Sequence, residues 1–451
     1  MKTEPTKVVV ISVGDAQYPQ DKLQIAIDSV REAVRSLPCA EVVYEGSIME
    51  DISADKVAAD VKKLVFDAII VNYVSWHITP YIMRTLIDYR EKPVLVWGIG
   101  GYYDENGKLY APAATAGTTA IIPALKELGF KYMLVNEKPG EPRRVADVER
   151  FLRVAGAVKA VKHSRIGLFG YADMGLYSCA YNKTLAYKKL GVDIEDYLAY
   201  DMQEKMDSFP EEEVKAEMEN ILANSKQFNE IPEKTLEKVT RLYLMMKEKR
   251  DGRHLDAVSI KCVYGVTQMG FNPCLAQTLL ADKDTAVICE CDAYGMLTGI
   301  ILQSITGKQS GFVEHYEVFD DSILVGVCGF IPRDFIEGDF TIRAANLGEF
   351  NYGISNVSKM KTGEVTYARL YETNGEYKLF LGKGEACPNP KWTEAGWCEP
   401  TPDFPSVLLK PGKDLQYYQE TVPGQHIIMV YGDYEKDIEL FCKFMGIEVV
   451  K

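Results

Sequence analysis

Long apolar runs alternate with amphipathic segments through the first third of the chain. Residues 7–13, 68–74 and 94–98 are apolar at nearly every position, which is typical of strands buried on both faces. The segments between them repeat apolar residues at helical spacing, over residues 20–36, 54–66 and 79–89. Because strands that alternate with helices form parallel sheets covered on both faces, we expect an α/β domain here.

A second set of strands and helices follows. A strand is predicted at residues 165–170, and the helix predicted at 179–190 stops at Gly191, a favoured position for a capping glycine. Residues 201–253 are charged but keep apolar residues on one face, as amphipathic helices with solvated outer faces do. Further strands are predicted at 257–263 and 285–289. The pattern indicates a second parallel-sheet domain.

The hydrophobic pattern changes after about Leu324. Turn signals such as Asn374-Gly375 separate runs of alternating, β-branched and aromatic residues, at 340–343, 364–370 and 377–381. A last helix is predicted at 434–445. We therefore predict an α/β fold in which two parallel-sheet α/β domains, 1–163 and 164–323, precede a C-terminal antiparallel, β-barrel-like domain, 324–451.

Composition and charge narrow the class of protein. The chain of 451 residues is 47% hydrophobic and 26% charged, as globular proteins are. Its formal net charge of −14 argues against nucleic acid or an anionic membrane as the main partner. No apolar run reaches the roughly 20 residues of a membrane span, and no secretory signal pattern follows Met1. Ten cysteines without a Cys-x-x-Cys pair indicate reduced thiols, so we expect a cytoplasmic protein.

Two short segments carry the candidate chemistry. Glu290 and Asp292 follow the buried strand at 285–289, and buried carboxylates are costly unless a cation or hydrogen-bond donors compensate them. His426 stands just before another apolar run. If the fold brings the segments together, they form a carboxylate and imidazole site for a divalent cation. Asp292 is equally well placed to cap the helix predicted at 294–304, so a purely structural role stays open.

Two motifs in the first domain allow weaker inferences. Gly98-Ile99-Gly100-Gly101 follows a strand, but its spacing differs from Gly-x-Gly-x-x-Gly and no clear helix follows, which argues against dinucleotide binding. Trp76 and His77 lie where another strand ends, the edge at which open α/β sheets bind ligands. The pair is either a packed contact or part of a substrate site.

Several segments together resemble the L-fucose/L-arabinose isomerase superfamily. The run Cys289-Glu290-Cys291-Asp292-Ala293-Tyr294-Gly295 resembles the family's carboxylate motif of Glu-Gly-Asp type and the small-residue helix after it. Pro423-Gly424-Gln425-His426, followed by Tyr431-Gly432-Asp433, resembles its C-terminal metal-histidine element. The stretch that begins Gly170-Tyr171-Ala172-Asp173 resembles the opening of its second domain. The resemblance spans nearly the whole chain and keeps the order of the elements.

Family members convert aldoses to ketoses with Mn²⁺ and assemble as trimers or hexamers with active sites between subunits. The resemblance therefore implies a metal-dependent isomerase of a small carbohydrate, with Mn²⁺ or another divalent cation bound by Glu290, Asp292 and His426. It assigns catalysis to Glu290 and Asp292, makes Trp76 a wall of a neighbouring subunit's site, and implies a homotrimer or homohexamer. The candidate substrate-binding residues are Trp76, His77, Tyr264 and Gln268.

The chain departs from the family pattern at two positions. Gly265 stands where a stretch such as Arg-Cys-Trp-Pro-Glu places the catalytic, metal-binding Glu, and Val327 replaces the His of a His-Cys-Gly element. Proton transfer through an enediol needs a base near C1 and C2 and a metal to acidify the proton. We therefore predict a divergent isomerase-family enzyme whose turnover of L-fucose and L-arabinose is weak or absent. The alternatives are a metal-dependent lyase or epimerase and a non-catalytic sugar-binding protein.

Overall fold

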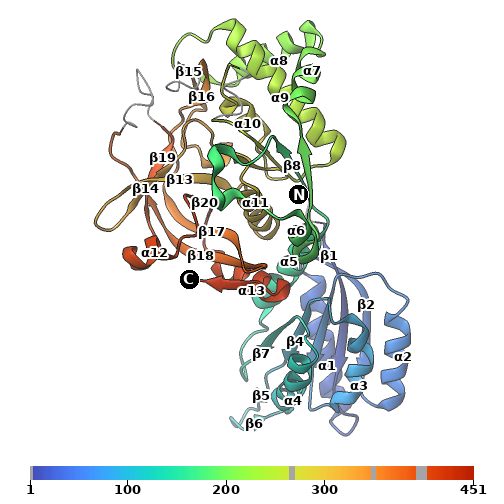
Figure 1. Cartoon of the computed structure of the whole chain (residues 1–451). Coiled ribbons are helices and arrows are strands. Elements are labelled where there is room, and N and C mark those ends of the chain that lie inside the picture. The colour runs from blue at the N-terminus through green and yellow to red at the C-terminus, as the bar shows by residue number, and fades with distance from the viewer. Residues whose placement is uncertain (1–3, 264–269, 347–351, 393–403) are drawn as a thin grey trace. The chain divides into compact units, whose positions relative to one another are not determined.

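The computed structural model describes residues 4–263, 270–346, 352–392 and 404–451, and the chain divides into two compact units (Figure 1). The N-terminal unit comprises Thr3–Lys159 with Asp437–Gly446, and the C-terminal unit comprises Ala160–Lys436 with Ile447–Lys451. Three positions of the sequence analysis lie outside the described residues, namely Tyr264, Gly265 and Gln268.

In the N-terminal unit, whose residues from 4 onward are described, the strands form a five-stranded parallel sheet of order β2-β1-β3-β4-β7. The strands are β1 (Thr6–Val13), β2 (Ala40–Ile48), β3 (Ala68–Tyr73), β4 (Val94–Gly98) and β7 (Tyr132–Asn136). The helices between them are α1 (Gln20–Arg35), α2 (Asp51–Val61), α3 (Thr79–Leu86), α4 (Ala114–Glu127) and α5 (Val145–Lys162). A small hairpin follows β4, formed by β5 (Tyr102–Tyr103) and β6 (Leu109–Tyr110).

Burial explains why these segments form strands. Residues of β1, β3 and β4 are almost all buried, as their continuous apolar runs predict, because helices cover the sheet. Strand β2 is missing from the sequence prediction, since it mixes charged and apolar residues. It lies at the edge of the sheet, where most of its residues are only half-buried.

The C-terminal helix α13 (Glu435–Met445) packs within the N-terminal unit through most of its length. The buried Asp437 side chain pairs with Arg150 and Arg153 of α5. The rings of Phe444 and Phe151 also contact each other, with 6.0 Å between their centroids. The sequence pattern predicts the helix but not its partner, because Asp437 and Arg150 are 287 positions apart.

The C-terminal unit begins with a second parallel sheet, of order β12-β11-β8-β9. Its strands are β8 (Arg165–Phe169), β9 (Asp193–Tyr197), β11 (Ala257–Ile260) and β12 (Ala286–Cys289). The helices are α6 (Lys183–Leu190), α7 (Ala199–Asp207), α8 (Glu211–Ala223), α9 (Glu233–Arg253), α10 (Cys274–Leu280) and α11 (Ala293–Thr306). Gly191 caps α6 in the left-handed conformation, with φ 74°, as predicted.

A mainly antiparallel sheet completes the C-terminal unit. Its order is β17-β20-β13-β14-β19-β18-β21, and β17 also pairs with β18. The strands are β13 (Gly311–Val318), β14 (Ile323–Gly326), β17 (Gly363–Thr373), β18 (Glu376–Cys387), β19 (Ser406–Lys410), β20 (His426–Tyr431) and β21 (Glu448–Val450). A smaller sheet joins β10 (Lys226–Gln227), β15 (Thr341–Asn346) and β16 (Tyr352–Asn356), and α12 (Leu415–Thr421) precedes β20.

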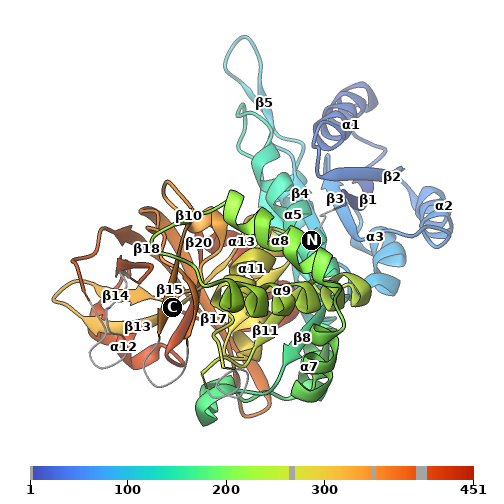
Figure 2. The same ribbon diagram turned by 90° about the horizontal axis from the view of Figure 1, so that it is seen from above.

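Helix α11 connects the two large sheets of the C-terminal unit. It packs against β11 and β12 of the parallel sheet and against β17 and β20 of the antiparallel sheet (Figure 2). Its residues from Ala293 to Ile305 are all buried. This placement brings the residues that follow β12 into contact with the first residue of β20.

The structure confirms a mixed α/β fold in which parallel sheets come first and a mainly antiparallel sheet comes last. The closure of that last sheet into a barrel and the domain boundaries at 163 and 323 stay predictions. In the part of the chain that the structure describes, no helix combines the length and the apolar character needed to cross a bilayer.

Candidate functional site

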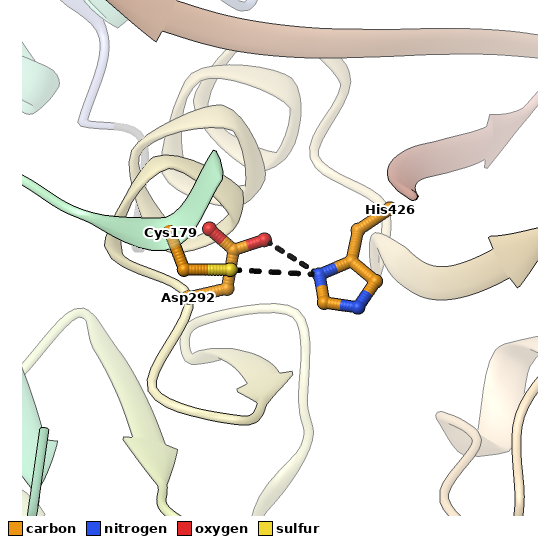
Figure 3. A group of neighbouring side chains, drawn as sticks. All are labelled: Cys179, Asp292 and His426. Carbon is orange, nitrogen blue, oxygen red and sulfur yellow. Dashed lines mark hydrogen bonds and ion pairs between the residues drawn. The ribbon is translucent and has the colours of Figure 1, made fainter. Parts of the chain in front are cut away.

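The two segments that carry the candidate chemistry meet in the C-terminal unit. Asp292, the N-cap of α11, and His426, the first residue of β20, are hydrogen-bonded with 3.0 Å between Oδ2 and Nδ1 (Figure 3). Glu290 lies at the other nitrogen of the imidazole, with 3.2 Å between its Oε2 and Nε2 of His426. All three side chains are buried. The structure thus brings together the three residues that the sequence singles out.

The turn after β12 has an unusual backbone. Glu290 and Cys291 have positive φ angles of 63° and 52°. This left-handed conformation costs about 1–2 kcal/mol for each non-glycine residue. The backbone N–H of Asp173 donates to the Glu290 carbonyl at 3.1 Å, and the Cys291 thiol lies 3.4 Å from the Phe169 carbonyl. Strain of this kind persists only where neighbouring contacts hold it, and it is concentrated at functional sites.

Both carboxylate oxygens of Asp292 have hydrogen-bond partners. Oδ1 accepts from the backbone N–H of Gly295 at 3.0 Å, which caps α11. Arg369 of β17, itself fully buried, donates from Nη1 to Oδ2 at 2.6 Å and from Nη2 to Oδ1 at 3.2 Å. Burial opposes ionisation, but Arg369 and His426 outweigh it and hold the pKa of Asp292 well below its usual value. Asp292 is therefore a carboxylate at neutral pH.

His426 is a buried imidazole between two carboxylates. The Phe312 ring packs on it at 4.3 Å between centroids, and Sγ of Cys179 lies 3.9 Å from Nδ1 (Figure 3). Burial opposes protonation, yet the hydrogen bonds with Asp292 and Cys179 and the nearby Glu290 carboxylate raise the pKa of His426 well above its ordinary value. Burial raises the pKa of the Cys179 thiol, so Cys179 stays protonated at neutral pH.

A hydrogen-bond network fixes the start of β20. Nδ1 of His315 lies 2.7 Å from the Gln425 carbonyl, and its Nε2 lies 2.7 Å from the hydroxyl of Tyr418. The Gln425 side chain accepts from the Ser178 hydroxyl at 2.8 Å. Burial lowers the pKa of His315 to about 4, so this imidazole is neutral at neutral pH. The network holds His426 in place through its neighbour in the chain.

Two atoms of the cluster are suited to hold a cation. Nε2 of His426 and Oε2 of Glu290 are buried and form no hydrogen bond with the described residues, although only 3.2 Å separates them. Glu314 of β13 stands opposite His426 in the strand register and offers an oxygen within 4.8 Å of both other ligand atoms. One imidazole nitrogen and two carboxylates suit Mn²⁺ and similar divalent ions. The Nδ1–H of His426 would then donate to Asp292, the usual outer-shell arrangement of a metal-binding histidine.

A second group of possible ligands consists of Cys179, Asp292 and His426 (Figure 3). In this group Asp292 is already paired with Arg369, and Cys179 carries its proton. The donors on the Glu290 side of the imidazole therefore fit a divalent ion better than those on the Asp292 side. The ligand set expected from the sequence stays a prediction, and the structure adds Glu314 as a candidate.

A second buried ion pair supports the turn that carries Glu290. Nζ of Lys261 lies 3.3 Å from Oδ1 of Asp173. The same carboxylate accepts from the backbone N–H groups of Val263 at 2.6 Å and Met174 at 2.8 Å. Since Asp173 also donates to the Glu290 carbonyl, the pair links the end of β11 to the turn after β12. Sequence reasoning misses the roles of Lys261 and Asp173, and their position after parallel strands is the one available signal.

Trp76 and His77 lie in the N-terminal unit, in the loop after β3. Trp76 is 38% exposed, whereas His77 is 1% exposed and has its Nδ1 3.0 Å from the Gly14 carbonyl. The rings of Tyr73 and Tyr81 contact His77 edge-on. His77 is thus packed in the core, the alternative considered above, and Trp76 keeps a surface available to substrate or to a neighbouring subunit.

Comparison with known proteins extends the resemblance seen in the sequence. The family described as L-fucose isomerase, C-terminal domain, matches residues 337–451. A sulfoquinovose isomerase of Priestia megaterium is 22% identical over 390 residues, which cover 84% of this chain and 85% of the relative. Another, from Alkalicoccus urumqiensis, is 22% identical over 394 residues, covering 85% and 86% of the two chains. A third, from Clostridium sp., is 23% identical over 371 residues, covering 79% and 80%. Together with the order of the motifs, these matches agree with the resemblance to the L-fucose/L-arabinose isomerase superfamily: the C-terminal part of the chain is similar to an L-fucose isomerase domain, and most of the chain is similar to sulfoquinovose isomerases at low identity.

Proposed function

We propose that the protein is a metal-dependent enzyme that interconverts an aldose and its ketose, acting on a small sugar or sugar derivative. The observation that carries the proposal is the convergence of Glu290, Asp292 and His426 from separate strand ends, in a family of sugar isomerases. The reaction moves one proton from C2 to C1 and another from O2 to O1, through an enediol. It needs a base beside both carbons and a group that polarises the carbonyl.

We infer that Mn²⁺ or another divalent cation is held by Nε2 of His426 and by the carboxylates of Glu290 and Glu314. The inference is supported by the buried atoms that lack hydrogen bonds and by the proximity of the three donors. A cation bound there would polarise the substrate carbonyl and acidify the proton on the adjacent carbon. With a cation on Nε2 in place of its proton, the remaining proton of His426 would stay on Nδ1, where Asp292 accepts it.

Of the two predicted catalytic carboxylates, Glu290 is the better proton carrier. Asp292 is paired with Arg369, and its lowered pKa makes it a weak base. Glu290 has two carboxylate oxygens, so Oε2, which forms no hydrogen bond with the described residues, can face the cation while the other oxygen carries the proton. In the proposed reaction Glu290 takes the C2 proton and returns it to C1, while Asp292 and Arg369 remain paired. This assignment would replace the family's Glu, whose place Gly265 takes in the sequence.

The names of the relatives suggest the first substrate to test. The proteins that match over most of this chain are named sulfoquinovose isomerase. We therefore put a sulfonated sugar first, ahead of L-fucose and L-arabinose. A lyase or epimerase on the same scaffold would use the same metal chemistry but cleave the sugar or invert one carbon. A sugar-binding protein would bind without turnover.

We further propose a homotrimer or homohexamer in the cytoplasm. Exposed aromatic side chains on both units support assembly. In the N-terminal unit Trp76 is 38% exposed and Tyr103 is 54% exposed, and in the C-terminal unit Tyr177 is 96% exposed and Tyr200 is 79% exposed. A head-to-tail interface that joins a surface of one unit to a different surface of the neighbouring copy's other unit would cover such side chains and could close into a ring. Light scattering that gives a monomer at micromolar concentration would contradict this proposal.

Product analysis by NMR tests the function. Metal-free and Mn²⁺-loaded protein is incubated with sulfoquinovose, L-fucose and L-arabinose, and we expect a ketose only with metal and chiefly from sulfoquinovose. Glu314→Gln should lose metal and activity, whereas Glu317→Gln, an exposed carboxylate on the same strand, should retain both. An epimer or a cleavage product would favour the alternative enzymes. Metal and sugar binding without product would favour the binding protein.

A further inference from the structure

A cavity in the N-terminal unit lies at the carboxyl edge of its parallel sheet. Its volume is about 530 Å³, within the range of small-molecule sites. Helix α1, the loop after β4 and the loop after β7 form its walls, through residues that include Leu23, Ala26, Ile99, Gly101, Glu137 and Arg143. This edge is where open α/β sheets bind their ligands. The residues that line it all belong to the N-terminal unit, so the cavity is separate from the cluster around His426.

A buried carboxylate stands at the back of this cavity. The Glu137 side chain is 1% exposed and pairs with Nη1 of Arg143. It also accepts from Nε1 of Trp97 at 3.0 Å, from the backbone N–H of Arg144 at 3.2 Å and from that of Gly100 at 3.3 Å. Because donors already surround Glu137, it has little capacity left for a ligand. Its arrangement serves to orient Arg143.

The guanidinium of Arg143 is fixed on two sides. Nη1 pairs with Glu137, and Nε donates to the Ser29 hydroxyl at 3.2 Å. No described residue accepts a hydrogen bond from Nη2 of Arg143. An arginine held in this way presents its remaining donors in a planar fork, the geometry that recognises carboxylates, sulfonates and phosphates.

The glycine motif after β4 has a structural role at this cavity. A Cβ at Gly100 would lie 2.4 Å from the Lys138 carbonyl, and a Cβ at Gly101 would lie 2.5 Å from the Tyr110 carbonyl. Glycine therefore lets the loop after β4 pack directly against the loop after β7 and bring the Gly100 N–H to Glu137. The motif shapes the cavity, although it does not fit the dinucleotide fingerprint.

Charge and polarity define what the cavity can accept. Lys22, Lys138 and Arg143 line it together with Glu137 and Glu141, so the lining is cationic by one charge in a chain of net charge −14. Most of the remaining wall is apolar, formed by Leu23, Ala26, Val74, Ile99, Pro112 and Pro142. A bare inorganic ion would leave that wall uncovered, and a neutral apolar molecule would offer no acceptor to Nη2 of Arg143.

We propose that this cavity binds a small organic anion. Its carboxylate, sulfonate or phosphate group pairs with the free edge of Arg143, and its apolar body lies against Leu23 and Ile99. The site does not depend on the proposed isomerase activity, since it uses none of the residues assigned to that reaction.

Isothermal titration calorimetry on the full chain tests the site. The probes are benzenesulfonate and phenyl phosphate, with sulfate as the charge-only control and benzyl alcohol as the apolar control. We expect both organic anions to bind at least about tenfold more tightly than either control. The ratio of the two organic anions identifies the preferred head group. Failure of wild type to bind either organic anion at millimolar concentration would overturn the proposal.

Variants assign the binding to this cavity. Arg143→Gln should weaken benzenesulfonate binding at least about tenfold. Arg144→Gln is the matched control, because its side chain pairs with Asp147 outside the cavity lining, and it should bind as wild type does. Leu23→Trp, which fills the apolar wall but keeps the Arg143–Glu137 pair, should also weaken binding. Undiminished binding by Arg143→Gln and Leu23→Trp would place the anion elsewhere and refute the assignment.

Discussion

Replacing Arg369 with Met removes the charge that compensates the buried Asp292 carboxylate. Arg369 donates to Asp292 at 2.6 and 3.2 Å and to the Ser178 carbonyl at 2.8 Å, and the side chains of the ion pair are both 0% exposed. After the substitution the carboxylate keeps His426 and Gly295 as donors. Removing one partner of a buried ion pair typically costs about 3–5 kcal/mol, because the other charge is left uncompensated. We expect the free energy of unfolding to fall by that amount at neutral pH.

The matched control is Lys410→Met, which breaks a surface pair. Lys410 lies 2.8 Å from Asp321, and their side chains are 48% and 66% exposed. Such pairs contribute about 0–1 kcal/mol. The proteins are unfolded in urea with a chelator present, and hydrogen exchange is followed in peptides from each unit. The measurement gives the loss of unfolding free energy in the C-terminal unit, with the N-terminal unit as internal reference. The double variant Arg369→Met/Asp292→Asn should be more stable than Arg369→Met, since neither charge remains.

The loss should also depend on pH. The pKa of Asp292 is lowered in the folded protein, so the pair stabilises the fold above the unfolded-state pKa of about 3.9 and this contribution is lost as pH falls below it. Wild type and Arg369→Met should therefore converge in stability in acid. A loss at neutral pH no larger than that of Lys410→Met would refute the reasoning about Asp292.

The metal, the pH dependence and the turn can be tested separately. After Mn²⁺ loading, elemental analysis should find no ion in His426→Ala and roughly 10–100-fold weaker binding in Asp292→Asn; full occupancy in His426→Ala would remove that residue from the site. The pKa of His315 is about 4 in the folded protein, so its neutral form stabilises the fold above the unfolded-state pKa of about 6.5 and this contribution is lost as pH falls toward 4. Between pH 6.5 and 4 the free energy of unfolding in urea should fall by about 3 kcal/mol more for wild type than for His315→Gln. Parallel plots of unfolding free energy against pH for the two proteins would contradict this. Asp173→Ala leaves the backbone N–H groups of Val263 and Met174 without their acceptor, which should lower the free energy of unfolding by about 1–3 kcal/mol for each group. It should also weaken Mn²⁺ binding more than Asp173→Asn does, because asparagine keeps an acceptor oxygen. Unchanged Mn²⁺ affinity in Asp173→Ala would exclude a positioning role.

The sequence predicts the parts of the site that depend on local pattern. An apolar run followed by Glu290 and Asp292 indicates a strand end, and Asp292 is recognisable as a helix cap because a carboxylate there can accept from the first helical N–H groups. The apolar run that follows His426 likewise predicts a strand, which places His426 where that strand begins. The sequence of Trp76-His77 is consistent with a packed pair and with a ligand-binding pair. The structure distinguishes the two residues, because His77 is buried whereas Trp76 is exposed.

The rest depends on strand register and on packing, which one sequence does not specify. In an alternating strand with one solvated face, Arg369 is expected to point to solvent. Strand β17 is instead buried from Val365 to Leu370, because α11 covers it, and its pairing with β20 brings Arg369 next to the start of that strand. Glu314 likewise becomes a candidate ligand only through its register opposite His426. The pairing of Asp173 with Lys261 joins residues that are far apart in the chain.

The proposed role of Glu290 is to move a proton between C2 and C1 of an aldose. NMR of sulfoquinovose in deuterated water with saturating Mn²⁺ measures this step as deuterium incorporation accompanied by ketose formation. Wild type and the exposed control Glu317→Gln should exchange at equal rates, and Glu290→Gln should be slower by about 10²–10⁴-fold, the usual contribution of a general base. Exchange by Glu290→Gln at the wild-type rate, or no exchange by metal-loaded wild type with any sugar of the panel, would contradict the claim.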